Sequence, residues 1–152
     1  MKKLLSIALF VFLVASCSTK EEAISIKGKW YTYAESGDYM ELWLGEDKAM
    51  SYLSGIDQFL LYDLKREGNS LYFSLLESRI IDEHSFQLEV TKSDEKLFQA
   101  TFIGGEKVDS LKTYFLLDTK IPDIKSSLDE NQALMNELFE RLESGSHAGH
   151  GH

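Results

Sequence analysis

The stretch YMELWLGEDKAMSYL, residues 39–53, indicates the fold of this chain most clearly. Met40, Leu42 and Leu44 occupy alternate positions in it, and a turn-forming Gly45 follows them directly. Because successive side chains of a β-strand point to opposite faces of the sheet, this period of two predicts a strand. The turn residues predict that the chain reverses there and continues as a second strand beside the first.

The same alternation recurs over residues 24–118. It is clearest in FQLEVT, residues 86–91, and turn segments such as Glu67-Gly68-Asn69 separate the runs. About eight short strands joined by tight turns, with no helix among them, predict an antiparallel meander. Such a meander tends to close into a small barrel, since closure removes unpaired edges. The expected interior side chains are Trp30, Met40, Leu42, Phe73 and Phe86.

Gly28-Lys29-Trp30 resembles the Gly-x-Trp signature of the first strand of lipocalin-like domains. Residues 39–53 and 60–76 also resemble the second to fifth strands of that family. The resemblance covers roughly residues 26–118, which is closer to the small lipocalin-like domains of Bacteroidota lipoproteins than to a full lipocalin. It implies a barrel in which the glycine permits a tight backbone approach at the floor and the tryptophan plugs that floor.

After Pro122 the spacing of apolar residues changes to that of a helix. Ser127-Leu128-Asp129-Glu130 has the form of a capping box, and we expect one amphipathic helix over residues 123–144. Its apolar stripe consists of Leu128, Leu134, Met135, Leu138, Phe139 and Leu142. We expect the stripe to pack against the barrel as a lid or side brace; alternatively it docks onto a second copy or another envelope protein. The predicted fold is thus mainly β, an antiparallel lipocalin-like meander barrel followed by one C-terminal helix.

The N-terminus has the features of a bacterial export signal. Lys2 and Lys3 precede an apolar run of about eleven residues, Leu4–Val14, which is too short to span a membrane but fits a signal peptide. Leu13-Val14-Ala15-Ser16-Cys17 resembles the lipobox of bacterial lipoproteins. This resemblance implies that Cys17 is acylated and becomes the first residue of the mature chain. The alternative is a soluble secreted protein with a free thiol.

The residues after this cysteine, STKEE at 18–22, resemble the Lys-acidic-acidic run of surface-exported Bacteroidota lipoproteins, or serve as a solvated tether. Either interpretation places the anchor in a bacterial cell envelope. We expect the outer membrane, and leave open whether the protein faces the cell surface. The predicted organisation is a cleaved signal peptide (1–16), a lipidated cysteine with an acidic tether (17–25), the barrel (26–118), the helix (123–144) and a flexible histidine-rich tail (145–152).

Composition and motifs exclude several classes of function. The formal net charge is −9, and no basic stripe interrupts this acidity, so nucleic acid is not an expected partner. The sequence lacks a Gly-x-Ser-x-Gly elbow and the glycine-rich phosphate and dinucleotide loops, so we expect no catalytic residues and no enzymatic activity. His84 follows Asp82 and Glu83, but sequence neighbours on a strand or turn point apart, and we expect a surface turn there.

The tail is the one segment that points to a metal. His147, His150 and His152 lie within the last six residues, and neutral imidazoles on a flexible chain can bind Zn²⁺, Cu²⁺ or Ni²⁺. A solvated terminus and an expression tag are the competing interpretations. No other cofactor is expected.

These observations favour a non-catalytic, lipid-anchored lipoprotein whose lipocalin-like barrel binds a small apolar ligand or an envelope partner protein. The alternative is a metal-binding lipoprotein that acts through the histidine tail. One consideration opposes a ligand, because barrels of about eight strands can be just filled by their own side chains. Contact with the membrane is expected through the lipid anchor alone, since an acidic surface is repelled by anionic headgroups.

Overall fold

The computed structural model describes residues 26–104 and 110–144 of the chain. The predicted signal peptide, Cys17 and the tether lie outside the described residues, and so do His147, His150 and His152. No helix within the described ranges is long and apolar enough to cross a membrane.

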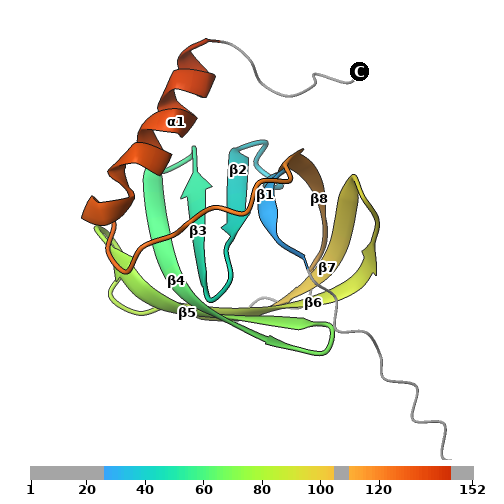
Figure 1. Cartoon of the computed structure of the whole chain (residues 1–152). Coiled ribbons are helices and arrows are strands. Elements are labelled where there is room, and N and C mark those ends of the chain that lie inside the picture. Colours follow the sequence, from blue (N-terminus) through green and yellow to red (C-terminus); the bar gives the residue numbers. More distant parts are fainter. Residues whose placement is uncertain (1–25, 105–109, 145–152) are drawn as a thin grey trace, which may run out of the picture.

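Eight antiparallel strands form a closed barrel in which each strand pairs with the next along the chain and β8 pairs with β1 (Figure 1). The strands are β1 (Gly28–Tyr33), β2 (Tyr39–Leu44), β3 (Lys48–Leu53), β4 (Gln58–Glu67), β5 (Ser70–Ser78), β6 (Ser85–Ser93), β7 (Leu97–Ile103) and β8 (Ser110–Asp118). This arrangement confirms the predicted antiparallel meander barrel. The turn expected after Leu44 joins β2 to β3.

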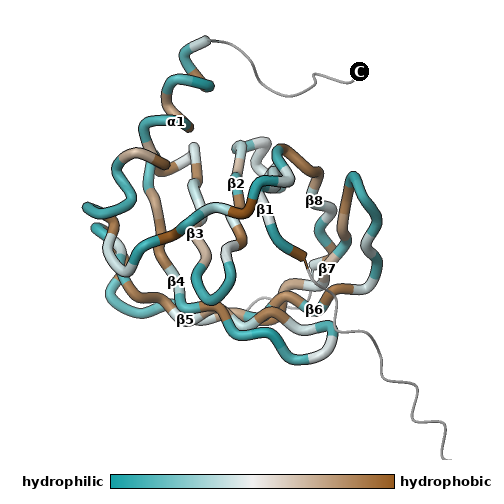
Figure 2. Tube along the Cα trace, in the orientation of Figure 1, coloured by the Kyte–Doolittle hydropathy of each residue, from teal (hydrophilic) through white to brown (hydrophobic). Residues whose placement is uncertain are grey.

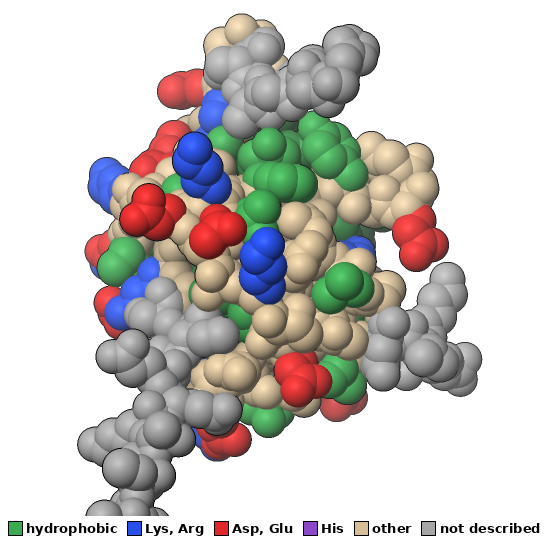
Figure 3. Space-filling model, turned by 90° about the vertical axis from the view of Figure 1, so that its right-hand side faces the viewer, with side chains coloured by type: hydrophobic (Ala, Val, Ile, Leu, Met, Phe, Trp, Pro, Cys, Tyr) green, Lys and Arg blue, Asp and Glu red, His purple; other side chains and the backbone are tan. Residues whose placement is uncertain are grey.

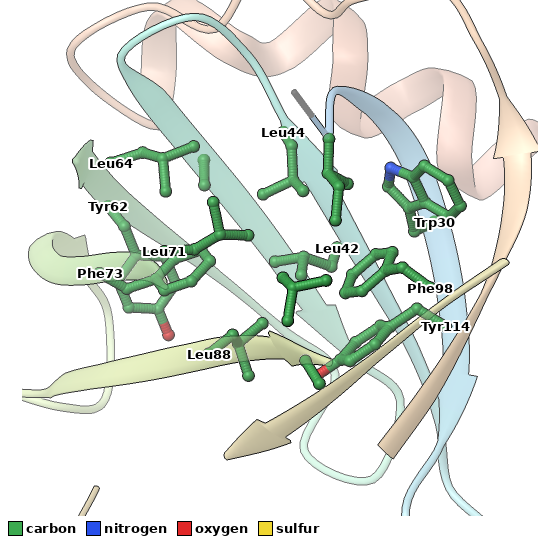
Figure 4. Close-up of a cluster of buried hydrophobic side chains, with 14 of the residues drawn as sticks. Trp30, Leu42, Leu44, Tyr62, Leu64, Leu71, Phe73, Leu88, Phe98 and Tyr114 are labelled. Atoms are coloured by element: carbon green, nitrogen blue, oxygen red, sulfur yellow. The ribbon is translucent and has the colours of Figure 1, made fainter. Parts of the chain in front are cut away.

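Alternate side chains of the strands point into the barrel and form one hydrophobic cluster (Figure 4). Cross-strand register places Trp30 opposite Leu42, and Phe98 opposite Tyr114, so each pair shares the inner face. Figure 2 shows apolar stretches alternating with hydrophilic ones along the chain. The expected interior residues found in this cluster are Trp30, Leu42 and Phe73, with Phe86 packed against them.

The end of the barrel where β1 begins is closed by specific contacts, and we call it the floor. Gly28 has a φ of 100°, and a Cβ there would lie 2.6 Å from the carbonyl oxygen of Asp118. Trp30 is 5% exposed, and its Nε1 donates to a backbone carbonyl 3.1 Å away. Arg66 reaches the same end and donates to the carbonyl oxygen of Gly45 at 2.7 Å. The close backbone approach and the plug implied by the Gly-x-Trp resemblance are therefore both present.

The C-terminal helix is shorter than the predicted span of 123–144. A 3₁₀ turn, η1 (Asp129–Asn131), precedes α1 (Gln132–Glu143), so the prediction began too early. The physical reason is the buried side chain of Asn131. Its Oδ1 accepts from the backbone N–H of Lys125 at 2.8 Å, and its Nδ2 donates to the carbonyl oxygen of that residue at 3.1 Å. These bonds satisfy backbone groups outside a helix and hold the preceding segment in an irregular path.

The predicted capping pair forms, but in a different place from the one expected. The hydroxyl of Ser127 donates to the carboxylate of Glu130 at 2.9 Å. Because Glu130 belongs to η1, the pair stands at the start of the 3₁₀ turn and not at the start of the α-helix.

Helix α1 packs on the outer face of β2, β3 and β4, where it covers a second hydrophobic cluster that we call the outer core (Figure 1). The outer core consists of Trp43, Met50, Tyr52, Phe59, Leu61, Ile124, Leu128, Met135 and Leu138. The prediction that the apolar stripe packs against the barrel is confirmed. The helix is a side brace, because its partners are outward-facing side chains of the barrel wall.

Two ion pairs, each with its barrel partner buried, join the helix to the barrel. Glu41 of β2 is 1% exposed and pairs with Arg141 of α1. Lys29 of β1 is 3% exposed, pairs with Glu137 at 2.5 Å, and lies 5.1 Å from the ring centroid of Trp43. A buried charge that loses its partner destabilises a protein strongly, so these pairs specify where α1 sits.

Candidate binding cavity

The end of the barrel opposite the floor is hollow, and we call it the mouth. It is bordered by the connections at 34–38, 54–57 and 79–84. A cavity of about 270 Å³ lies in this half, and Met40 and Leu53 beside those connections line it. This volume is near the lower end of the range for small-molecule sites and far exceeds the space of one water molecule. The barrel's own side chains therefore fill only part of its interior.

The cavity wall is mainly apolar. Its aromatic residues are Tyr62, Phe86, Phe102 and Tyr114, and its aliphatic residues are Met40, Leu42, Leu53 and Leu60. The ring of Phe86 stacks on Phe102 with centroids 5.1 Å apart, and it meets Tyr62 edge to face at 5.4 Å. Phe86 also stacks on Phe73 with centroids 4.3 Å apart, so its ring is held between neighbouring aromatic rings. The wall is suited to a small apolar ligand.

Two phenol groups belong to this wall. Burial raises the pKa of Tyr62 to about 12, while a hydrogen bond with Ser51 acts in the opposite direction. Burial also raises the pKa of Tyr114. Both hydroxyls are therefore protonated at neutral pH and can donate or accept a hydrogen bond.

Two residues with formal charge line the cavity, and only one directs its charge inward. Both carboxylate oxygens of Glu41 are occupied on the outer side of the wall, where the hydroxyl of Tyr39 and Nε1 of Trp43 each donate at 2.6 Å. Lys112 of β8 lies opposite Ala100 of β7, whose side chain is fully buried inside the barrel. Because directly opposed residues share a face, the Lys112 side chain points inward.

His84 lies in the connection between β5 and β6, as expected for a turn. Its side chain, however, is not simply a surface group. The ring is half-buried, lies 5.4 Å from the ring of Phe86 and lines the cavity. The expectation of a surface turn was therefore right for the backbone and wrong for the imidazole, which borders the mouth.

The sequence analysis missed Lys112 as a site residue. A signal was present, since Lys112, Tyr114 and Leu116 alternate along β8 and predict one shared face. Apolar Leu111 and Phe115 occupy the other face, so hydropathy alone did not identify which face was inside. Within residues 26–104 and 110–144, no group of three or more His, Cys, Asp or Glu side chains is placed to hold a metal ion.

An aromatic patch covers the outer wall around β1. Tyr31 lies between Phe115 and Tyr39, with ring centroids 5.5 and 6.1 Å away, and Tyr33 packs against Tyr39 at 5.7 Å. Phe115 is 41% exposed and Tyr33 is 44% exposed. Figure 3 shows apolar side chains gathered on one face of the molecule, among charged ones. The apolar surface of this barrel is thus divided between its interior, the outer core and this exposed patch.

Comparison of the chain with protein-family models, curated proteins and solved structures finds no match.

Proposed function

We propose that this chain is a non-catalytic, lipid-anchored lipoprotein of the bacterial cell envelope, and that its lipocalin-like barrel holds a small apolar ligand. The observation that carries the proposal is the cavity of about 270 Å³ in the mouth half, walled by aromatic and aliphatic side chains. The lipobox-like segment ending at Cys17 supports the anchor, and the short apolar run before it supports export.

The cavity favours ligand binding over a purely structural barrel. Apolar space inside a protein forfeits dispersion contacts, and side chains that filled it would stabilise the fold. The floor half of the same barrel achieves that filling, with Leu44 and Phe98 at 0% exposure. A barrel that packs one half completely and leaves the other half open is consistent with a retained binding site.

Native mass spectrometry of the full lipoprotein, extracted gently from its own membrane, tests the proposal. We expect a co-purifying small mass that survives chelation. A Leu53→Trp variant, which places a large ring in the mouth, should lose that mass. The matched control is Leu76→Trp, because Leu76 is 43% exposed on β5 and does not line the cavity. Both variants should keep the circular dichroism spectrum of the wild-type barrel.

Other outcomes favour the alternatives. A mass that disappears only on chelation would favour metal binding through His147, His150 and His152, which lie outside the described residues. A wild-type lipoprotein that carries no small mass and takes up no apolar probe would overturn the ligand proposal. The expectation of an envelope partner protein would then be the remaining candidate.

A further inference from the structure

We propose that the ligand is a small carboxylate, whose negative charge is bound by Lys112 while its apolar body lies against Phe86 and Phe102. This inference rests on the proposed function, since it assigns a chemical class to the ligand of the same cavity. Three observations carry it: the position of Lys112, its electrostatic surroundings, and the size of the space.

The first observation is that the Lys112 side chain lies at the cavity. Lys112 belongs to the wall of the cavity, on the same strand and face as Tyr114. Its cross-strand partner Ala100 is small and fully buried, so it leaves room beside the lysine stem. Rings of Phe86 and Phe102 line the same space. A molecule in the cavity can therefore touch the lysine side chain and these rings at once.

The surroundings of Lys112 differ from those of the other cations turned into the fold. Lys29 is paired with Glu137 at 2.5 Å. The guanidinium of Arg66 donates to backbone carbonyls, including Gly45 at 2.7 Å. Over the ranges 26–104 and 110–144, no carboxylate forms an ion pair with Lys112.

Glu41, the other charged residue in the cavity wall, does not neutralise Lys112. The carboxylate of Glu41 is directed to the outer side and is bound by Arg141, Tyr39 and Trp43. Lys112 is a half-buried residue, and a cation beside apolar groups interacts more strongly with an anion than one in bulk water, because the local dielectric constant is lower. Among residues 26–104 and 110–144 no carboxylate pairs with Lys112, and an anionic ligand would supply that partner.

The size of the cavity narrows the chemical class of the ligand further. The cavity volume of about 270 Å³ is close to that of the smallest sites that hold small molecules. The packed floor half, with Leu71 and Leu88 at 2% and 0% exposure, leaves no room for a long acyl chain. These features indicate a compact carboxylate.

Two probe molecules of matched shape test whether the site prefers a negatively charged ligand. 2-Naphthoate and 2-naphthamide have nearly the same shape, and only the first is an anion. Titration calorimetry of the full lipoprotein in detergent should show naphthoate binding at least about tenfold more tightly than naphthamide, as expected for one charge-assisted contact. Lys112→Met should remove that preference while leaving the naphthamide affinity within about twofold.

Two further variants separate a ligand contact from a general effect. Lys112→Arg keeps the positive charge and should retain the preference for naphthoate. Lys92→Met removes the same charge from an exposed position on β6 and should behave as wild type. Unfolding midpoints of all variants, measured in urea, establish that each protein is folded before binding is compared.

The outcomes distinguish this inference from the proposed function. Equal binding of the two probes to the wild-type protein would overturn the carboxylate assignment and leave the apolar site standing. Loss of both probes in Lys112→Met, with the fold intact, would make Lys112 a packing residue and would also overturn the assignment. If neither probe binds the wild-type protein, the ligand proposal itself fails for molecules of this size.

Discussion

The floor half and the mouth half of this barrel are built from the same eight strands but are filled differently. At the floor, Trp30 packs edge to face on Phe98 with ring centroids 4.9 Å apart, and Arg66 closes the end by binding backbone carbonyls. At the mouth, Phe86 and Phe102 are only partly buried and surround a cavity. We infer that the packed side chains of the floor contribute most to stability, whereas the open space at the mouth lowers the stability of that half.

The largest expected loss of stability comes from a substitution at the floor. Trp30→Ala should lower the free energy of unfolding by about 4 kcal/mol, because it removes a buried indole and leaves a cavity. The matched change at the mouth is Phe102→Ala. It should cost only about 1 kcal/mol, since that ring is partly exposed and already borders open space. Urea titration followed by circular dichroism measures both values.

The comparison would fail if the two changes were equally destabilising. That result would mean that the mouth contributes to the core as much as the floor does, and that the cavity is not a separate feature of the fold.

The next largest effect concerns the ion pair that joins helix α1 to β2. Arg141→Leu should lower the free energy of unfolding by about 2 kcal/mol, because it leaves the buried carboxylate of Glu41 without its counter-charge. Adding Glu41→Gln to this variant should restore part of the loss, since a neutral amide still accepts a hydrogen bond from Tyr39 or Trp43. The measurement is the same urea titration, applied as a double-mutant cycle.

An additive double variant would contradict this interpretation. The two side chains would then act independently, and the position of α1 would depend on the outer core alone.

The smallest effect is a loss of stability at high pH that arises at the mouth. Burial raises the pKa of Tyr62 from 10.0 to about 12, so the folded state retains a proton that the unfolded state releases above pH 10. The contribution of Tyr62 is fully present below pH 10 and is lost as pH rises toward 12. The expected loss is about 1 kcal/mol at about pH 11.

Tyr62→Phe should show a shallower decline in unfolding free energy than the wild-type protein between neutral and alkaline pH. Tyr114, whose pKa burial also raises, contributes in the same direction and remains in this variant. Identical pH profiles for the two proteins would show that ionisation of Tyr62 is not linked to unfolding.

Several features could be predicted because they follow from local patterns. The alternation at Met40, Leu42 and Leu44 predicted β2 and its inner face, and the glycine turn after it predicted the reversal into β3. Spacing of apolar residues predicted that Met135 and Leu138 face the barrel, which the outer core confirms. Periodicity of this kind depends only on the geometry of a strand or a helix.

Other features could not be predicted because they depend on contacts between distant residues. Asn131 shortens the helix through bonds to Lys125, which no capping pattern reveals. Trp43 alternates as an outward residue yet is 1% exposed, because α1 covers it. Lys112 lies inside only because its strand is locked in register against Ala100.

The sequence by itself determined the strand order, the two faces of most strands and the apolar stripe of the C-terminal helix, because alternation and helical spacing are properties of neighbouring residues. Only the tertiary structure decided that one half of the barrel is packed and the other hollow. Whether inward side chains meet across a barrel depends on their volumes and on the register of all eight strands together, and no single stretch contains that information.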